Sequence, residues 1–512
     1  MFGEKVPSSE FINRGEYRDK VLGCWTGKNI GGTLGAPMEG RREIFDVNFY
    51  VQDLKGKPAP NDDIDLQLIW LLAVEENGID QVNERVLGEY WLSHITGPWN
   101  EYGVGKVNMA NGLVPPLSGA FNNEQWKNSN GAWIRSEIWA CLFPGAPDDA
   151  LEFAWCDACV DHADDGIYAE LFTTALDSAA FVESDIRKLI DIALAKIPTD
   201  CRVARSVGIA IREYEAGHDF KTARNAVVED SADLGWFQAP ANVAFAVIGL
   251  LYGEGDFGRS LCFAVNCGDD TDCTGATVGA VLGIVKGRSG IPAEWIEPIG
   301  ETIRTVAIDP FHAEAPADLD ELTERVIRCA EETQTVNPTL PRLTDGPTTI
   351  SEKLRASLLS GEQVERRLWH KSSFAFRTAL PFGVVEVEYL DGLEAVPGET
   401  KKLRLSLRNP RIESKICYFD WTLPEGWQIK QGDQQSIGIR YGAISCIDVE
   451  LTVGEFDGNY VHLPLSVRLS GRNYPTFVTV PFQFRGSVKT TLEKQDSIYW
   501  DNHDRMLARR AR

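Results

Sequence analysis

The chain has 512 residues. A single hydrophobic core does not usually support a chain of this length, so we expect two or more domains. Its 51 basic and 75 acidic residues give a formal net charge of -24, which would repel a phosphate backbone and argues against nucleic acid as a partner. The first residues contain no apolar signal core, and no apolar run approaches the roughly 20 residues that a membrane helix needs, so we expect a soluble, cytoplasmic protein.

The 11 cysteines are scattered along the chain, without the paired CxxC spacing that binds zinc. An odd number in a chain of this length favours free thiols in a reducing compartment. Cys156 and Cys159 do form one CxxC, but the surrounding residues follow a helical pattern. We therefore interpret this pair as part of a helix face, with a redox or metal role as the alternative.

Residues 1–335 carry the hydrophobic periodicity of helices. Stretches such as SDIRKLIDIALAKI (184–197) and ANVAFAVIGLLYG (241–253) place apolar residues three and four positions apart, and Gly or Pro separates the stretches. We predict an all-α catalytic domain over this region. Residues 336–375 then combine a linker rich in Pro and Gly with one amphipathic helix, which we place over 351–370.

The hydrophobic period changes to two after about residue 376. Stretches such as VVEVEYL and VHLPLSVRLSG alternate apolar and polar residues, with turn residues between them, which is typical of an antiparallel β-sandwich. We predict an immunoglobulin-like sandwich over 376–486 and a C-terminal tail over 487–512. The predicted fold class is therefore a multidomain chain with an all-α bundle followed by an antiparallel β-sandwich.

Two acidic clusters stand immediately before apolar helical runs: NDDID at 61–65, and Asp269, Asp270 and Asp272 in NCGDDTDCTG. Aspartates at helix starts commonly cap free backbone N–H groups, and capping is the simplest interpretation of either cluster alone. However, both clusters adjoin segments poor in charge, where unpaired carboxylates are costly to bury without a counter-ion. Two divalent ions need more carboxylates than one helix end offers, so we predict that the clusters meet around metal.

Glycines recur at every fourth position in two of the predicted helices. One face of each helix then lacks side chains, so another backbone can approach it closely. Glycine destabilises a helix by about 1 kcal/mol per interior position relative to alanine. Packing or function must therefore compensate for the lost helix stability at these positions. Glu39 lies just beyond the first ridge. The two glycine ridges consist of Gly23, Gly27, Gly31 and Gly35, and of Gly275, Gly279, Gly283 and Gly287.

Five motifs follow one another along the chain: GGTLGAPMEG, NDDID, SNGAWIR, DHADD and NCGDDTDCTGATVGAVLG. In order and rough spacing they resemble the ADP-ribosylglycohydrolase family, typified by dinitrogenase reductase-activating glycohydrolase, over about residues 17–310. The paired acidic motifs are specific in that order, whereas any one alone would be weak. The resemblance implies an orthogonal all-α bundle with two divalent cations at the base of a cleft, Mg²⁺ foremost and Mn²⁺ or Ca²⁺ as alternatives.

The resemblance also implies roles for individual residues. Glu39 and Asp62 would be catalytic, with Glu39 as a general acid or base. The metal ligands would be Asn61, Asp62, Asp63, Asp270, Asp272 and Cys273, and the ligand-binding residues would include Asn130, Gly131, Arg135 and His162. The sequence departs from the family pattern where Asn61 and Cys273 each replace a Thr and where Gly32 replaces an Asp. A thiol is a poor ligand for magnesium, but four carboxylates remain, with Asp65 and Asp269 beside them.

The loop-rich region 97–135 supplies further candidates for substrate binding. Lys106, Lys127 and Arg135 could bind a diphosphate. Trp99 and Trp126 could stack on an adenine or equally on the face of a sugar.

Hydrolysis at the anomeric carbon of a ribosyl group is the reaction that the resemblance implies. Our first hypothesis is a metal-dependent glycohydrolase that releases ADP-ribose or a related ribosyl group from a small-molecule or protein acceptor. The alternative is a glycosidase of the same fold acting on a carbohydrate or nucleoside, because the segment around LPEGW (423–427) weakly resembles immunoglobulin-like accessory modules of carbohydrate-active enzymes. The third hypothesis is a catalytically inactive ligand-binding protein. The β domain could instead cover a wall of the helical domain or contact a second copy of the chain.

Overall fold

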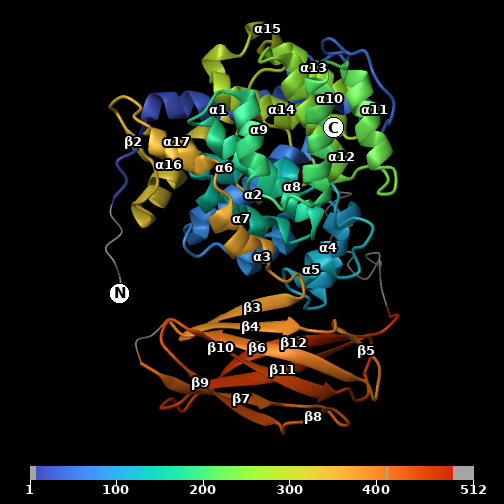
Figure 1. Ribbon diagram of the computed structural model, residues 1–512, viewed down its shortest axis with the longest axis vertical. Helices are drawn as coiled ribbons and strands as arrows, with labels where there is room; N and C mark the ends of the chain where they lie inside the picture. Colours follow the sequence, from blue (N-terminus) through green and yellow to red (C-terminus); the bar gives the residue numbers. More distant parts are fainter. Residues whose placement is uncertain (1–6, 411–412, 488–512) are drawn as a thin grey trace.

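The computed structural model describes residues 7–410 and 413–487. Helices form one body of the molecule and two β-sheets form the other (Figure 1). The predicted fold class, a helical bundle followed by an antiparallel β-sandwich, is therefore confirmed. The predicted domain boundaries stay a prediction, and the tail predicted over 487–512 lies outside the described residues except for Ser487. No helix among the described residues is long and apolar enough to span a bilayer.

The helical part packs around one large apolar core, in which Trp25, Trp70, Trp91, Trp133 and Trp139 are fully buried. In chain order, the helical part begins with a short strand and ends with a long helix. The helices are α1 (Arg14–Gly35), α2 (Asp62–Asn77), α3 (Glu84–His94), α4 (Asn100–Ala110), α5 (Leu117–Ala120), α6 (Glu137–Leu142), α7 (Pro147–Ala158), α8 (Asp165–Ala180), α9 (Ile186–Leu194), α10 (Arg202–Glu215), α11 (Phe220–Asp230), α12 (Ala239–Gly253), α13 (Phe257–Asn266), α14 (Thr271–Lys286), α15 (Ala293–Ile296) and α16 (Leu319–Val336).

The connection between the two bodies differs from the prediction of one helix over 351–370. The structure has α17 (Glu352–Leu358) and α18 (Glu362–Val364), followed by a single π-helical turn over Glu365–Trp369. Ser360 and Gly361 separate the two helices, since glycine weakens a helix interior. Upstream, β2 (Arg342–Thr344) pairs in parallel with β1 (Phe11–Asn13) and ties this connection back to the start of the chain.

Two five-stranded sheets form the C-terminal body, and their facing residues build a second apolar core. The sheets have the strand orders β3-β4-β6-β10-β8 and β5-β12-β11-β7-β9, and all strand pairs are antiparallel except the short β12 to β5 pair. The strands are β3 (Ala375–Leu380), β4 (Gly383–Tyr389), β5 (Glu394–Ala395), β6 (Thr400–Arg408), β7 (Lys415–Trp421), β8 (Gln428–Ile429), β9 (Gln434–Ile439), β10 (Ile444–Thr452), β11 (Tyr460–Leu469) and β12 (Thr476–Phe484).

Helix α5 lies at the side of the helical body that faces the sandwich (Figure 1). Leu113, Leu117 and Phe121 from the segment around α5 belong to the apolar core of the sandwich rather than to that of the helical part. His462 of β11 also donates a hydrogen bond to the carbonyl of Asn111, over 2.8 Å. The sandwich therefore supports the segment of the helical part that precedes residues 129–131, which we call the SNG loop.

Helices α1 and α14 pack against each other along the two glycine ridges, so the backbone that approaches each bare face is that of the other ridge. A Cβ atom placed on Gly27 would lie 1.9 Å from the carbonyl oxygen of Gly279, and one on Gly31 would lie 1.9 Å from that of Gly275. Only glycine permits backbones to approach this closely. Because the helices run in opposite directions, the end of α1 and the following Glu39 lie beside the start of α14.

Candidate functional site

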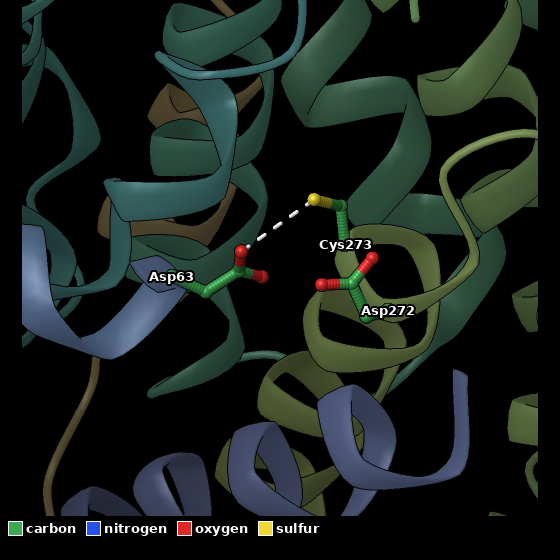
Figure 2. A group of neighbouring side chains, drawn as sticks. All are labelled: Asp63, Asp272 and Cys273. Carbon is green, nitrogen blue, oxygen red and sulfur yellow. Dashed lines mark hydrogen bonds between the residues drawn. The ribbon is translucent and has the colours of Figure 1, made fainter. Parts of the chain in front are cut away.

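The N-termini of α2 and α14 converge on one point, although their sequences are more than 200 residues apart. Asp63 from α2 faces Asp272 and Cys273 from α14 (Figure 2), and one ligand atom from each of the three lies within 4.8 Å of the others. Glu39, Asp270 and Asp272 form a second group of the same size. We call these the thiol cluster and the carboxylate cluster, and Asp272 belongs to both.

The acidic residues of the two motifs divide into structural anchors and residues that face the clusters or the cleft beside them. Asp65 accepts hydrogen bonds from the backbone N–H groups of Val306 and Ala307. Asp269 accepts one from the N–H of Phe237, over 3.0 Å. Both therefore hold loops in place, and neither belongs to a cluster. Asp62 also belongs to neither cluster; it lines the adjoining cleft and accepts a hydrogen bond from the Tyr102 hydroxyl over 2.9 Å.

The remaining carboxylates have oxygen atoms that lack donors. Asp270 Oδ1 and Asp272 Oδ1 are buried without a hydrogen-bond partner among the described residues. Burial raises the pKa of Asp270 to about 6 and that of Asp272 well above its usual range, where Glu39 and Asp270 add repulsion. Crowded, buried carboxylates with unused oxygens suit a hard divalent cation, so this donor set fits the metal that the sequence predicts.

Asn61 does not present its side-chain oxygen to the clusters. Its Oδ1 caps α2 by accepting a hydrogen bond from the N–H of Asp63, over 2.6 Å. Its Nδ2 occupies the space that a side chain at position 32 would need, 2.3 Å from a Cβ placed on Gly32. The two departures from the family pattern at positions 32 and 61 are therefore coupled by packing.

Lys28 adds a fixed positive charge behind the thiol cluster. Its buried Nζ lies 2.8 Å from Glu137 Oε1 and 3.6 Å from Asp63 Oδ2. Burial lowers the pKa of Lys28, but the carboxylates of Glu137 and Asp63 outweigh that effect and raise it overall. The ammonium thus compensates part of the charge of Asp63, while Cys273 donates its S–H to the same carboxylate over 3.5 Å.

A cleft of about 410 Å³ opens beside the clusters. Trp99 and Trp236, which are 37% and 43% exposed, lie among the aromatic residues of its wall. The sequence did not single out Trp236 or Phe237; the only local signal is the pattern Gly-Trp-Phe before an apolar helix. The cleft is lined by Glu39, Asp62, Trp99, Asn100, Glu101, Tyr102, Ser129, Asn130, Gly131, Ile134, Trp236, Phe237, Asp270, Asp272, Cys273 and Val306.

The SNG loop connects the cleft to the carboxylates. Asn130 Nδ2 donates to Asp270 Oδ2 over 2.7 Å, and the N–H of Gly131 donates to Glu101 Oε1 over 3.1 Å. His162 is fully buried behind this loop, where its Nε2 lies 3.2 Å from the Ser129 hydroxyl and its Nδ1 lies 2.8 Å from Asp161. Asn130 and Gly131 therefore line the cleft, whereas His162 supports the loop from behind.

None of the three predicted diphosphate donors is among the residues that line the cleft. Lys106 is buried and donates to the carbonyl of Ile95. Lys127 pairs with Glu124 and Asp164. Arg135 is fully buried within a network of acids, and Trp126 is half-buried and is not among the residues that line the cleft.

Arg135→Met is expected to destabilise the protein by about 3–5 kcal/mol, because it leaves two buried carboxylates without their cation. The guanidinium lies 2.7 Å from Asp157 and 2.7 Å from Asp161. Urea unfolding of the full chain measures the change. Arg259→Met, at a residue that is 56% exposed, serves as the control and should change the free energy of unfolding by less than about 0.5 kcal/mol. Equal stability of the Arg135 variant and the wild type would contradict the structural role.

Glu39 stands at the junction of the carboxylate cluster and the cleft. Its carboxyl lies close enough to Asp270 and Asp272 for a shared ligand. Glu39 keeps more than a third of its surface exposed; desolvation of the remainder, together with the charges of Asp270 and Asp62, raises the pKa of its carboxyl to about 7. A carboxyl that ionises near neutral pH can donate or accept a proton during a reaction, which suits a general acid or base.

A comparison with protein families matches the helical part of the chain. The family model described as ADP-ribosylglycohydrolase matches residues 13–335. A solved structure described as an ADP-ribosylglycohydrolase-related protein complex shares 21% identity, covers 62% of this chain and 99% of its own, and superposes with a TM-score of 0.42. A second, the alkylpurine DNA glycosylase AlkC of Pseudomonas fluorescens bound to DNA containing an abasic site analog, shares 12% identity, covers 84% of this chain and 100% of its own, and has a TM-score of 0.14. Neither likeness is close enough to bear on function, and no curated protein matches the sequence significantly.

Proposed function

The chain belongs to the ADP-ribosylglycohydrolase family, and from this premise we propose that it is a metal-dependent glycohydrolase that cleaves a glycosidic bond by attack of water at the anomeric carbon. One observation carries the proposal. Asp270 and Asp272 each have a buried carboxylate oxygen that finds no hydrogen-bond partner among the described residues, and they meet the proton-transfer candidate Glu39 at the wall of a cleft. Such a set combines ligands for metal with an acid or base in one place.

The metal part of the proposal assigns ligands to the two clusters. Asp63, Asp270 and Asp272 would hold two divalent cations, with Asp62 and Glu39 beside them, and Mg²⁺ suits the all-oxygen carboxylate cluster best. Cys273 makes the thiol cluster less suited to Mg²⁺ and better suited to a softer cation. When bound, the cations would hold sugar hydroxyls and lower the pKa of a bound water.

The protein's own residues would perform the remaining steps. Glu39 would transfer a proton to the leaving group or from the attacking water, since its pKa is about 7. Tyr102 and Asn130 would fix the orientations of Asp62 and Asp270 through their hydrogen bonds. The carboxylates of the cleft would stabilise the positive charge that develops on the glycosyl ring in an oxocarbenium-like transition state.

Chelation with EDTA is expected to abolish hydrolysis, and added Mg²⁺ or Mn²⁺ should restore it. Glu39→Gln should lower kcat by about 10²–10⁴-fold, since it removes the proton donor while keeping the shape of the side chain. The measurement is turnover of 4-nitrophenyl glycosides and release of ADP-ribose from modified protein, with metal content determined on the same samples. Turnover that survives chelation would contradict the metal requirement. A metal-loaded protein without turnover on either substrate class would contradict the hydrolase and favour a ligand-binding protein.

A further inference from the structure

The charged residues that line the cleft are all acidic. Its charged lining residues are Glu39, Asp62, Glu101, Asp270 and Asp272, and none of the lining residues in the described part of the chain is Lys, Arg or His. Cations bound at the clusters would neutralise carboxylates there. Glu101 belongs to neither cluster, so above its pKa of about 7 its charge would persist in the metal-loaded protein. On its inner side, His162 Nε2 lies 3.7 Å from Glu101 Oε1. The cleft would therefore repel an anionic substrate even with its metals in place.

The two arginines that follow Glu39 in the chain are already paired. Arg41 forms an ion pair with Glu43, and the Nε of Arg42 lies 3.5 Å from Asp269 Oδ2. The three cations predicted for a diphosphate are engaged elsewhere, as described above. A diphosphate entering this cleft would have to displace existing ion pairs to gain a Lys or Arg side chain as a partner.

Glu101 also takes the backbone donor that the SNG loop could offer to a phosphate. The N–H of Gly131 is satisfied by Glu101 Oε1, and a Cβ placed on Gly131 would lie 2.4 Å from the same oxygen. Glu101 is only 5% exposed, and its buried Oε2 lacks a hydrogen-bond partner among the described residues. A carboxylate accepts hydrogen bonds and repels phosphate, so Glu101 favours hydroxyl donors over phosphates beside this loop.

The aromatic wall fits the same kind of ligand. Trp99 packs against Gly97, where a Cβ would lie 2.4 Å from the indole ring. The ring centroids of Trp236 and Phe237 lie 4.4 Å apart. Both tryptophans keep more than a third of their surface exposed. Exposed indole faces bordered by carboxylates suit sugar rings, whose C–H faces stack on aromatic rings while their hydroxyls donate hydrogen bonds.

We infer that the cleft takes an uncharged glycosyl group, stacked on Trp99 or Trp236, and that Glu101 is the residue that excludes an anionic diphosphate such as that of ADP-ribose. This inference rests on the proposed hydrolysis and narrows its substrate to neutral glycosides. It makes Glu101 a specificity determinant, separate from the residues that would hold metal.

Glu101→Gln tests the inference directly, because the amide keeps an acceptor for the N–H of Gly131 and removes the charge. Calorimetry on the full, metal-loaded chain would compare ADP-ribose with adenosine, its neutral counterpart without the diphosphate. Burial raises the pKa of Glu101 to about 7, so the titrations belong at pH 8, where the carboxylate is ionised. Glu89→Gln, which makes the same charge change on an exposed face of α3, is the matched control.

The wild type should bind ADP-ribose no more tightly than millimolar, and Glu101→Gln should tighten that binding by about tenfold or more without a similar change for adenosine. Trp236→Ala should raise the KM for a hydrolysed neutral 4-nitrophenyl glycoside by about tenfold. Micromolar binding of ADP-ribose to the wild type would overturn the inference, as would an equal gain in affinity for ADP-ribose in Glu89→Gln. Neither result would contradict the proposed hydrolase activity. Absence of turnover on all substrates would overturn the proposed hydrolase activity. The ratio of the affinities for ADP-ribose and adenosine would still decide whether the cleft prefers a neutral or an anionic ligand.

Discussion

Asp272→Asn is expected to abolish metal binding and hydrolysis together while the fold stays intact. Asp272 is the one residue that contributes to both the thiol cluster and the carboxylate cluster, so its loss weakens both. Its pKa lies well above its usual range because of burial and the neighbouring carboxylates of Glu39, Asp270 and Asp63. Removing this charge relieves repulsion in the metal-free protein. We therefore expect the metal-free variant to be at least as stable as the wild type.

Calorimetry with Mg²⁺, Mn²⁺ and Ca²⁺ measures the first part of this prediction, and urea unfolding of the metal-free protein measures the second. Metal affinity should fall by more than about 100-fold, since changes to residues that only orient ligands already cost 10–100-fold. Asp269→Asn is the matched control three residues earlier. Its amide can still accept the hydrogen bond from Phe237, so metal binding should persist. Unchanged stoichiometry and affinity in Asp272→Asn would remove the metal assignment altogether.

The features that sequence predicts best are those in which a fixed spacing carries the physical meaning. Glycines at every fourth position identify a bare helix face whatever surrounds it, and the structure brings those faces together in register, with Gly27 against Gly279. The acidic helix starts are similar, because buried carboxylates demand a counter-charge wherever they lie. The change of period near residue 376 likewise predicts the β-sandwich that the structure contains.

The roles of single charged residues could not be predicted in the same way. A sequence shows that Arg135 is a cation but not that Asp157 and Asp161, more than 20 residues later, are buried against it. Asn61 is a comparable case, because its orientation depends on the space left by Gly32 in another helix. Trp236 lies in a loop whose path is set by Asp269, and no local pattern encodes that contact. Partners distant in sequence therefore decide which polar residues reach the cleft.

Gly279→Ala is expected to destabilise the protein by about 3 kcal/mol or more and to reduce metal affinity at the same time. A Cβ at this position would lie 2.0 Å from the carbonyl oxygen of Gly27, a backbone atom that moves only if the two helices separate. Overpacking of a well-filled interior typically costs about 1–3 kcal/mol, and a clash between two rigid backbones belongs at or above the upper end. Because α14 also carries Asp272, separation of the helices displaces a ligand of both clusters.

Gly208→Ala in α10 is the matched control for this prediction, since a Cβ there would meet only the flexible end of Arg212 at 3.4 Å. Alanine is a better helix former than glycine, so this variant should gain up to about 1 kcal/mol where Gly279→Ala loses stability. Urea unfolding of both variants gives the difference, and calorimetry with Mg²⁺ gives the effect on the clusters. If Gly279→Ala is as stable as Gly208→Ala, the close approach of α1 and α14 is wrong. If Gly279→Ala is unstable but binds metal with wild-type affinity, the glycine ridges support the fold without positioning the carboxylates. The positions of the metal ligands are then determined by the loops that Asp65 and Asp269 anchor.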